Sequence, residues 1–161
     1  MPQQGSSTAV DLQRHEARQA FARDVLAVPS VCIARASEDA SFRSYWRVSP
    51  GPAGHASCIL MDAPPGKEDL GPWLDIAARL RNAGLHAPQV FALDQGQGFV
   101  LMEDLGTRTL LPELADASVE ALYAQAMEAL LRMQCSASVD GLPAYDRQRL
   151  LDEMNLLPIW F

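Results

Sequence analysis

The sequence predicts an α+β fold in which a five-stranded antiparallel sheet with one inserted helix is followed by further helices. Between residues 30 and 103, short segments rich in β-branched, aromatic and other apolar residues are separated by turn formers, as strands are. One stretch with helical spacing of apolar residues interrupts these segments after the third. Beyond Gly106 the apolar residues recur every three or four positions, which is typical of helices.

Each predicted element has its own boundary signals. A leading helix covers residues 1–29 and stops at Pro29. The strands are expected at residues 30–35, 45–49, 57–62, 89–93 and 99–103. The inserted helix is expected at 71–83, because Pro72 suits a first helical turn and Gly84 a stop. One later helix is expected around 119–133 and a last one from Asp146 through Leu157. These signals divide the chain into 1–29, 30–105 and 106–161.

Composition bounds the class of protein. A chain of 161 residues with 48% hydrophobic and 20% charged residues is typical of a globular protein with one core. Its 20 acidic and 13 basic residues give a net charge of -7, so neither nucleic acid nor an anionic membrane is an expected partner. The first residues lack the features of a secretory signal, and no apolar run approaches the roughly 20 residues of a membrane span. We expect a cytoplasmic protein.

Neither the cysteines nor the histidines indicate a reactive site. The cysteines are odd in number and widely spaced, and we expect buried free thiols at Cys32, Cys58 and Cys135. The histidines have no carboxylate or nucleophile at an informative spacing, and we expect surface or loop positions for His15, His55 and His86.

Three stretches, residues 37–48, 59–65 and 99–106, carry a family resemblance. Together with the element order they resemble the aminoglycoside phosphotransferase family, and within it the bacterial kinases that phosphorylate the anomeric hydroxyl of N-acetylmuramate and N-acetylglucosamine in cell-wall recycling. The resemblance covers the chain from about Val31 onward. It implies a protein-kinase-like, nucleotide-binding amino-terminal lobe at 30–105 and the beginning of a substrate lobe at 106–161.

The first stretch would form a phosphate-binding loop. The resemblance places the loop at Asp39, Ala40, Ser41, Phe42 and Arg43. Such a loop needs small residues, because its backbone amides must approach the anion closely. Ala40 and Ser41 are small, but the loop has no glycine, and Glu38 and Asp39 would repel phosphate unless they point away. The alternative is a solvated hairpin loop.

The third strand departs from the family pattern. Many relatives place Lys or Arg there to hold the α- and β-phosphates, whereas this chain has Met61 followed by Asp62. Either another cation replaces it, or the affinity for nucleotide is modest. The candidate cations are Arg43, Arg47 and Lys67, although an ordinary surface role remains open for the arginines. In such kinases an acidic residue of the inserted helix pairs with the third-strand cation. Asp75 is the nearest candidate here, but with Met61 in the cation position it is expected to be a solvated acid.

The third stretch, residues 101–106, resembles the hinge that joins the two lobes of such kinases. Adenine recognition at a hinge uses main-chain groups, so the resemblance implies the Glu103 carbonyl and the Leu105 amide as its partners. Met102 would close the back of an apolar pocket. The alternative is an edge strand that ends in a turn, since Asp104 followed by Gly106 is common turn chemistry.

The catalytic residues of the resembled family are missing. Phosphoryl transfer there depends on a His-x-Asp segment and on an Asp-x-Asp region that holds Mg²⁺. Neither pattern occurs in residues 1–161. We therefore expect no catalytic or metal-binding residue in this chain, with those residues beyond Phe161, and we expect the chain alone to be inactive.

Three hypotheses follow from the sequence. The first is the ATP-binding portion of a kinase that acts on a sugar, with ATP and the sugar as partners and Mg²⁺ held by the missing lobe. The second is a nucleotide-binding or regulatory module without chemistry. The third is an interaction protein that docks through its apolar carboxy-terminal helices, which could also make the chain self-associate.

Overall fold

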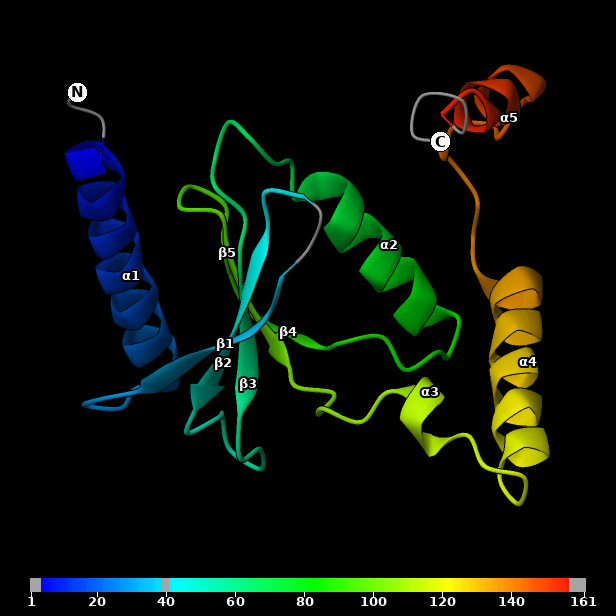
Figure 1. Cartoon of the computed structure of the whole chain (residues 1–161), viewed down its shortest axis with the longest axis horizontal. Helices are drawn as coiled ribbons and strands as arrows, with labels where there is room; N and C mark the ends of the chain where they lie inside the picture. The colour runs from blue at the N-terminus through cyan, green and yellow to red at the C-terminus, as the bar shows by residue number, and fades with distance from the viewer. Residues whose placement is uncertain (1–3, 39–40, 157–161) are drawn as a thin grey trace.

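A computed structural model describes residues 4–38 and 41–156, without the side chains of residues 4–10 and Glu38. The elements, in chain order, are α1 (Gln4–Leu26), β1 (Cys32–Glu38), β2 (Ser44–Ser49), β3 (Cys58–Asp62), α2 (Gly71–Asn82), β4 (Val90–Asp94), β5 (Phe99–Glu103), α3 (Leu110–Glu113), α4 (Val119–Ser136) and α5 (Arg147–Met154). The sheet stands between α1 and α2, and α3, α4 and α5 follow beyond α2 (Figure 1).

The five strands form one sheet in the order β1-β2-β3-β5-β4, and every neighbouring pair is antiparallel. Helix α2 connects β3 to β4, as the sequence predicts, so the α+β fold with one inserted helix is confirmed. The turn between β4 and β5 comes very close to the end of β3, where the Ala63 amide donates to the Gly98 carbonyl at 2.9 Å. Gly98 has φ +72°, and a Cβ there would lie 1.9 Å from the Ala63 oxygen, so only glycine fits.

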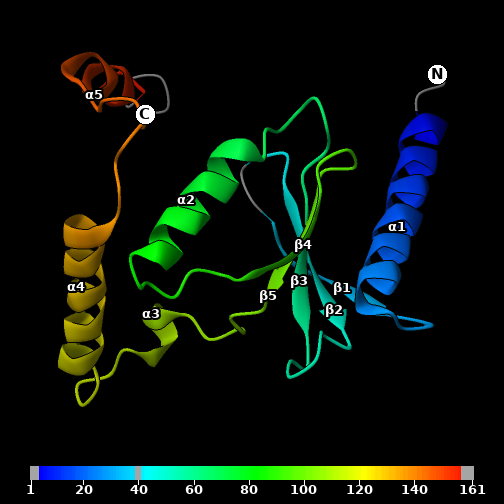
Figure 2. The same cartoon turned by 180° about the vertical axis from the view of Figure 1, so that it is seen from behind.

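The sheet has two apolar faces because successive side chains of a strand point to opposite sides. The face toward α1, here called the outer face, has a buried core at Ala22, Val48, Cys58, Leu60, Phe99 and Leu101. The face toward α2, here called the inner face, has a buried core at Met61, Ala63, Leu70, Val100 and Met102. The reverse view shows the same arrangement, with α1 and α2 on opposite sides of the sheet (Figure 2). Each large buried side chain contributes about 1.5 to 3 kcal/mol to stability.

Several predicted boundaries are wrong by a few residues. Strand β1 begins at Cys32 and runs to Glu38 rather than covering 30–35, because residues on both sides of a bulge after Arg35 still pair with β2. Helix α1 ends at Leu26, before Pro29, and the chain turns at Ala27 with φ 52°. The four-residue helix α3 was not predicted, because a single turn carries no periodicity. Leu157, expected in the last helix, lies outside the described residues.

The helices after the hinge differ from the sheet region in burial. None of the described residues of α3, α4 or α5 is buried. Large apolar side chains are instead exposed, among them Met127, Leu131 and Met154 at 62%, 58% and 70%. Arg79 of α2 reaches the loop after α4 and donates to the Ser138 carbonyl at 2.9 Å. No helix among the described residues is long and apolar enough to span a membrane.

The cysteine prediction is correct at one position of three. Cys58 is buried in the outer-face core, where burial is the main cause that raises the pKa of its thiol to about 11. Cys32 and Cys135 are exposed free thiols, because the first begins an edge strand and the second lies on an uncovered helix.

Candidate functional site

The inner face of the sheet is buried and apolar at Met61, the third-strand position where the resemblance implies a cation in many kinases of this kind. The Met61 side chain is fully buried and packs with Val100 and Met102 under α2. Tyr45 of β2 lies opposite Met61 in the ladder and packs against the same cluster. The third strand thus offers a thioether and no charge at this point, and any cation for a phosphate must come from another element.

The described part of the predicted phosphate loop is attached to the connection between β3 and α2. The Phe42 amide donates to Glu68 Oε1 at 3.0 Å, and the Arg43 guanidinium lies 4.0 Å from the same carboxylate. Ser41 Oγ accepts from the Arg43 amide and from Arg43 Nε, at 3.2 and 3.0 Å. The Phe42 side chain is 63% exposed, with the Lys67 ammonium 5.0 Å from its ring centre. Asp39 and Ala40, which the sequence also placed in this loop, lie outside the described residues.

Within the predicted hinge, the Glu103 side chain is bound to the connection between α2 and β4. Glu103 ends β5, and its carboxylate contacts His86 Nε2 at 2.9 Å and accepts from the Gln89 amide at 3.1 Å. The His86 contact is the largest cause that holds the pKa of Glu103 below its ordinary value. The expected surface position of His86 is confirmed, since its side chain is 72% exposed, but its expected isolation from carboxylates is wrong. The pairing escaped the sequence because 17 residues separate the partners.

Two other predicted site residues flank this segment. Met102 is buried behind the hinge, whereas the side chain of Leu105 is 55% exposed in front of it. Among the described residues, no intrachain hydrogen bond uses the Leu105 amide. A buried thioether next to an uncommitted backbone amide has the chemistry of an adenine subsite, since the ring is apolar and its edge accepts a hydrogen bond.

Arg47 is bound to the far end of the hinge segment. Its Nε and Nη2 donate to the two oxygens of Asp104 at 2.6 and 3.0 Å, and Nη2 lies 3.3 Å from the Gly106 carbonyl. Ser57 Oγ adds a third contact to Asp104 at 2.6 Å. Hydrogen bonds from Arg47 are the largest cause that holds the pKa of Asp104 far below its ordinary value. Asp104 is therefore a fixed anion, and Arg47 already has its counter-charge.

The candidate cations are therefore not in one place. Arg43 precedes the first residue of β2, whereas Arg47 lies four residues further, opposite Ile59 of β3. At about 3.3 Å per residue the two positions are separated by roughly 13 Å along the strand. Arg43 and Lys67 flank the predicted phosphate loop, and Arg47 lies at the hinge end of the site. Asp75 is half-exposed, as expected of a solvated acid, but it pairs with Arg79 of its own helix, which was not predicted.

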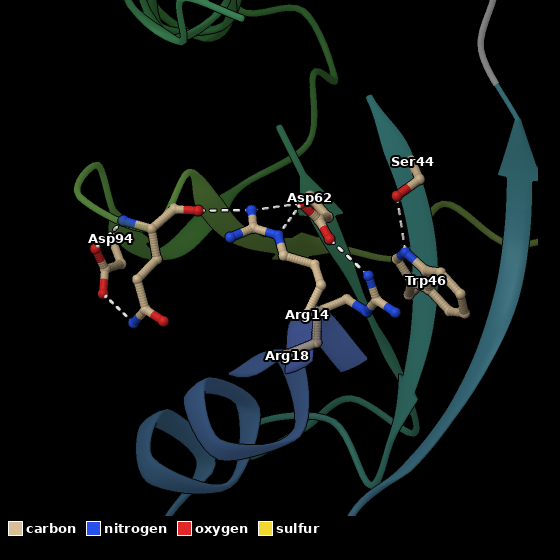
Figure 3. A network of polar contacts seen from close by, with 7 residues as sticks. Arg14, Arg18, Ser44, Trp46, Asp62 and Asp94 are labelled. Carbon is tan, nitrogen blue, oxygen red and sulfur yellow. Dashed lines mark hydrogen bonds and ion pairs between the residues drawn. The ribbon is translucent and has the colours of Figure 1, made fainter. Parts of the chain in front are cut away.

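A buried charge network on the outer face was not predicted from the sequence. Arg14 and Arg18 of α1 both donate to the buried carboxylate of Asp62, at 2.5 and 2.7 Å (Figure 3). Arg14 also donates to the Gln97 carbonyl at 2.6 Å, which connects α1 to the turn between β4 and β5. The Arg18 guanidinium lies 4.0 Å from the centre of the Trp46 ring. Two arginines four positions apart on a helix are the signal that could have indicated an acidic partner.

The described residues contain no metal centre. Within 4–38 and 41–156, no three His, Cys, Asp or Glu side chains gather closely enough to hold a metal ion. The polar contacts described above lie around the loop at 41–43 and the predicted hinge at 101–106. The buried inner-face core lies between them.

A five-stranded antiparallel sheet with a helix after the third strand is the arrangement of a protein-kinase-like amino-terminal lobe. The family model described as the phosphotransferase enzyme family, APH, matches residues 33–158. The chain therefore belongs to the aminoglycoside phosphotransferase family.

Three curated relatives are similar to the chain. N-acetylmuramate/N-acetylglucosamine kinases of Pseudomonas aeruginosa and Pseudomonas putida are each 40% identical over 134 residues, which cover 83% of this chain and 39% of the relative. A protein of the same name from Neisseria meningitidis is 35% identical over 130 residues, which cover 78% of this chain and 38% of the relative. The chain thus spans about two fifths of the length of the curated relatives it matches.

Proposed function

We propose that this chain is the ATP-binding portion of a sugar kinase. The observation that carries the proposal is the inner face, where the hinge at 101–106 borders the buried pair Met61 and Met102. The Glu103 carbonyl and the Leu105 amide would bind the edge of adenine, with Met102 behind the ring. Membership of a phosphotransferase family supports a nucleotide rather than another apolar ligand.

The phosphates would lie toward the loop that connects β1 to β2. Residues Asp39, Ala40, Ser41 and Phe42 would cover them, and Arg43 would supply the cation that Met61 does not. We assign this role to Arg43 rather than Arg47, because Arg43 adjoins the loop at 41–42, whereas Arg47 lies at the hinge end of the strand beside Asp104. Lys67 is close enough to the loop to contribute a second positive charge.

The names of the relatives support the class of acceptor. All three are N-acetylmuramate/N-acetylglucosamine kinases. We propose that the γ-phosphate of ATP goes to the anomeric hydroxyl of such an amino sugar in the cytoplasm, within cell-wall recycling. The groups that hold Mg²⁺ and accept the substrate proton would come from a lobe that residues 1–161 do not contain. Residues 30–105 would then be the nucleotide-binding lobe and residues 106–161 the start of the substrate lobe.

NMR titration of the 161-residue chain tests this proposal. Millimolar ATP is expected to shift the amide resonances of residues 41–43 and 102–106, whereas N-acetylmuramate leaves them in place. If the sugar moves these resonances and ATP does not, the hinge is not an adenine site. A chain extended by the second lobe of a relative should phosphorylate the sugar, and the 161-residue chain should not.

The carboxy-terminal helices support a second, separate proposal. Apolar side chains of α4 and α5 that would pack on a further lobe are exposed, among them Leu131 and Met154. Exposed apolar patches of this kind tend to associate. We expect the 161-residue chain to self-associate through these helices, and a monodisperse monomer at high concentration would contradict this.

A further inference from the structure

We propose that Arg47 and Ser57 position the hinge for adenine by holding Asp104, and that these three residues act as positioning residues for nucleotide binding. The inference rests on the proposed ATP site. The group formed by Arg47, Ser57, Asp104 and Gly106 is called the Asp104 clamp below. It gives Arg47 a role in adenine recognition that is distinct from contact with phosphate.

The clamp joins three segments that are distant in the sequence. Arg47 comes from β2, Ser57 directly precedes β3, and Asp104 directly follows β5. The guanidinium contacts both carboxylate oxygens, at 2.6 and 3.0 Å, and the Ser57 hydroxyl donates to the same oxygen as Arg47 Nε. Bidentate, charge-assisted contacts fix orientation as well as distance. Asp104 in the predicted hinge is therefore fixed to β2 through Arg47 and to the residue before β3 through Ser57.

The clamp also fixes the backbone on the far side of the Leu105 amide. Asp104 Oδ1 accepts from the Gly106 amide at 2.9 Å, and Arg47 Nη2 lies 3.3 Å from the Gly106 carbonyl. Gly106 has φ +90°, and a Cβ there would meet no atom of the described residues within 4 Å, so the turn is held by these polar contacts rather than by packing. On the near side, the Glu103 amide donates to the Gln89 carbonyl at 2.8 Å. The backbone is thus held by hydrogen bonds on both sides of Leu105, at Glu103 and at Gly106.

Burial and charge distinguish the clamp from an ordinary surface ion pair. The Asp104 side chain is 7% exposed, compared with 48% for Asp75 in the helical pair with Arg79. The pKa of Asp104 is held far below its ordinary value, mainly by the Arg47 hydrogen bonds, so the carboxylate stays charged throughout the physiological range. If Arg47 is lost, a largely desolvated anion is left next to the hinge, and the turn must open to hydrate it.

The test uses two fragments of ATP on the 161-residue chain. Adenosine reports on the hinge, and inorganic tripolyphosphate reports on the phosphate end. For Asp104→Asn and Arg47→Met we expect adenosine binding to weaken by about tenfold while tripolyphosphate binding stays within about twofold, because only the hinge loses its orientation. Arg47→Lys keeps the positive charge but not the two-pronged guanidinium contact with Asp104, and its adenosine affinity should be intermediate. Asp75→Asn, an acid-to-amide change at a surface pair, is the matched control and should alter neither affinity.

Hydrogen exchange in the free chain gives a readout that needs no ligand. The Gly106 amide, which donates to Asp104 Oδ1, should exchange faster in Asp104→Asn than in the wild-type chain, while the α2 amides keep their rates. If Asp104→Asn does not fold, Ser57→Ala keeps the ion pair and should show the same pattern at smaller amplitude.

The possible failures are distinguishable. A wild-type chain that binds neither ATP nor adenosine overturns the proposed function, and unchanged exchange of the Gly106 amide in Asp104→Asn then overturns the clamp as well. A wild-type chain that binds both, with Asp104→Asn binding adenosine equally well, overturns the clamp alone. Equal losses for adenosine and tripolyphosphate would also overturn it, because they indicate general destabilisation.

Discussion

Asp62 and Asp104 are both carboxylates bound by arginine, the first buried and the second partly buried, and they lie in different parts of the fold. Asp62 lies on the outer face, where Arg14 and Arg18 bind it between α1 and β3. Asp104 follows β5, where Arg47 binds it beside the hinge. Their side chains are 3% and 7% exposed. The same chemistry therefore joins a covering helix to the sheet in one place and orients a candidate ligand-binding segment in the other.

We therefore expect Asp62 to matter mainly for the stability of the fold and Asp104 mainly for nucleotide binding. A change at Asp62 should affect how firmly α1 is held and leave the inner face unaltered, because the carboxylate points away from Met61 and its neighbours. A change at Asp104 should affect the hinge first. The following predictions examine the separation, in order of expected effect on the free energy of unfolding.

The largest effect is expected for Asp62→Asn. The substitution leaves the buried charge of Arg18 and the partly buried charge of Arg14 without their anion, and removing one partner from a buried ion pair costs about 3 to 5 kcal/mol. Urea denaturation of the chain should show this loss, while the folded protein still binds adenosine. A denaturation midpoint no lower than that of Asp75→Asn would contradict a structural role for the network.

A smaller effect with a defined pH dependence is expected for Asp104→Asn. Because the folded-state pKa of Asp104 lies below its unfolded value, its stabilisation is fully present above the unfolded pKa of about 3.9 and is lost as the pH falls below it. At pH 7 the variant should be less stable than the wild-type chain by about 1.5 to 3 kcal/mol. Denaturation curves at a series of pH values should converge as the pH falls below about 4. A difference that stays constant down to pH 2 would show that the charge of Asp104 is not involved.

A still smaller effect is expected for Met61→Leu on the inner face. The swap nearly conserves volume and should cost less than about 1.5 kcal/mol. Since Met61 offers packing and no charge, ATP binding should be unchanged, whereas Arg43→Ala should weaken it. Isothermal titration of both variants decides the point, and a loss of ATP affinity in Met61→Leu comparable to that of Arg43→Ala would show that the thioether contacts the nucleotide directly.

The smallest effect on stability is expected for Leu131→Gln on α4. Its side chain is 58% exposed, so the free energy of unfolding should change by no more than about 0.5 kcal/mol. Sedimentation velocity should nevertheless show less self-association than for the wild-type chain. Undiminished association would place the contact on another surface.

The sequence predicted the elements because their signals are local. Residues 99–103 and 71–83 showed strand composition and helical spacing within a few positions of one another, and both elements formed with nearly these bounds. The charge networks were not predicted, because Arg14 and Asp62 are 48 positions apart and Arg47 and Asp104 are 57. Only the sheet register brings such partners together, and no local pattern encodes it.

For the candidate site too, local patterns were informative and partners distant in the sequence were not predicted. Met102, expected at the back of an apolar pocket, lies buried, whereas the burial of Met61 in the same cluster was not predicted. Arg47 was considered as a phosphate ligand because alternation gives the face of a residue but not its partner. The roles of Arg43, Glu103 and Leu105 stay predictions, since they depend on a bound nucleotide.

The fixed position of Gly106 has a mechanical consequence. Its amide is held by Asp104 and its carbonyl is contacted by Arg47, so the chain up to this residue is tied to the sheet. Thr107 is the first residue beyond these contacts, and it is followed by α3 and the exposed helices. We therefore expect a rotation of α3 relative to the sheet to change the dihedral angles of residues 107–109 rather than those of the segment proposed to bind adenine.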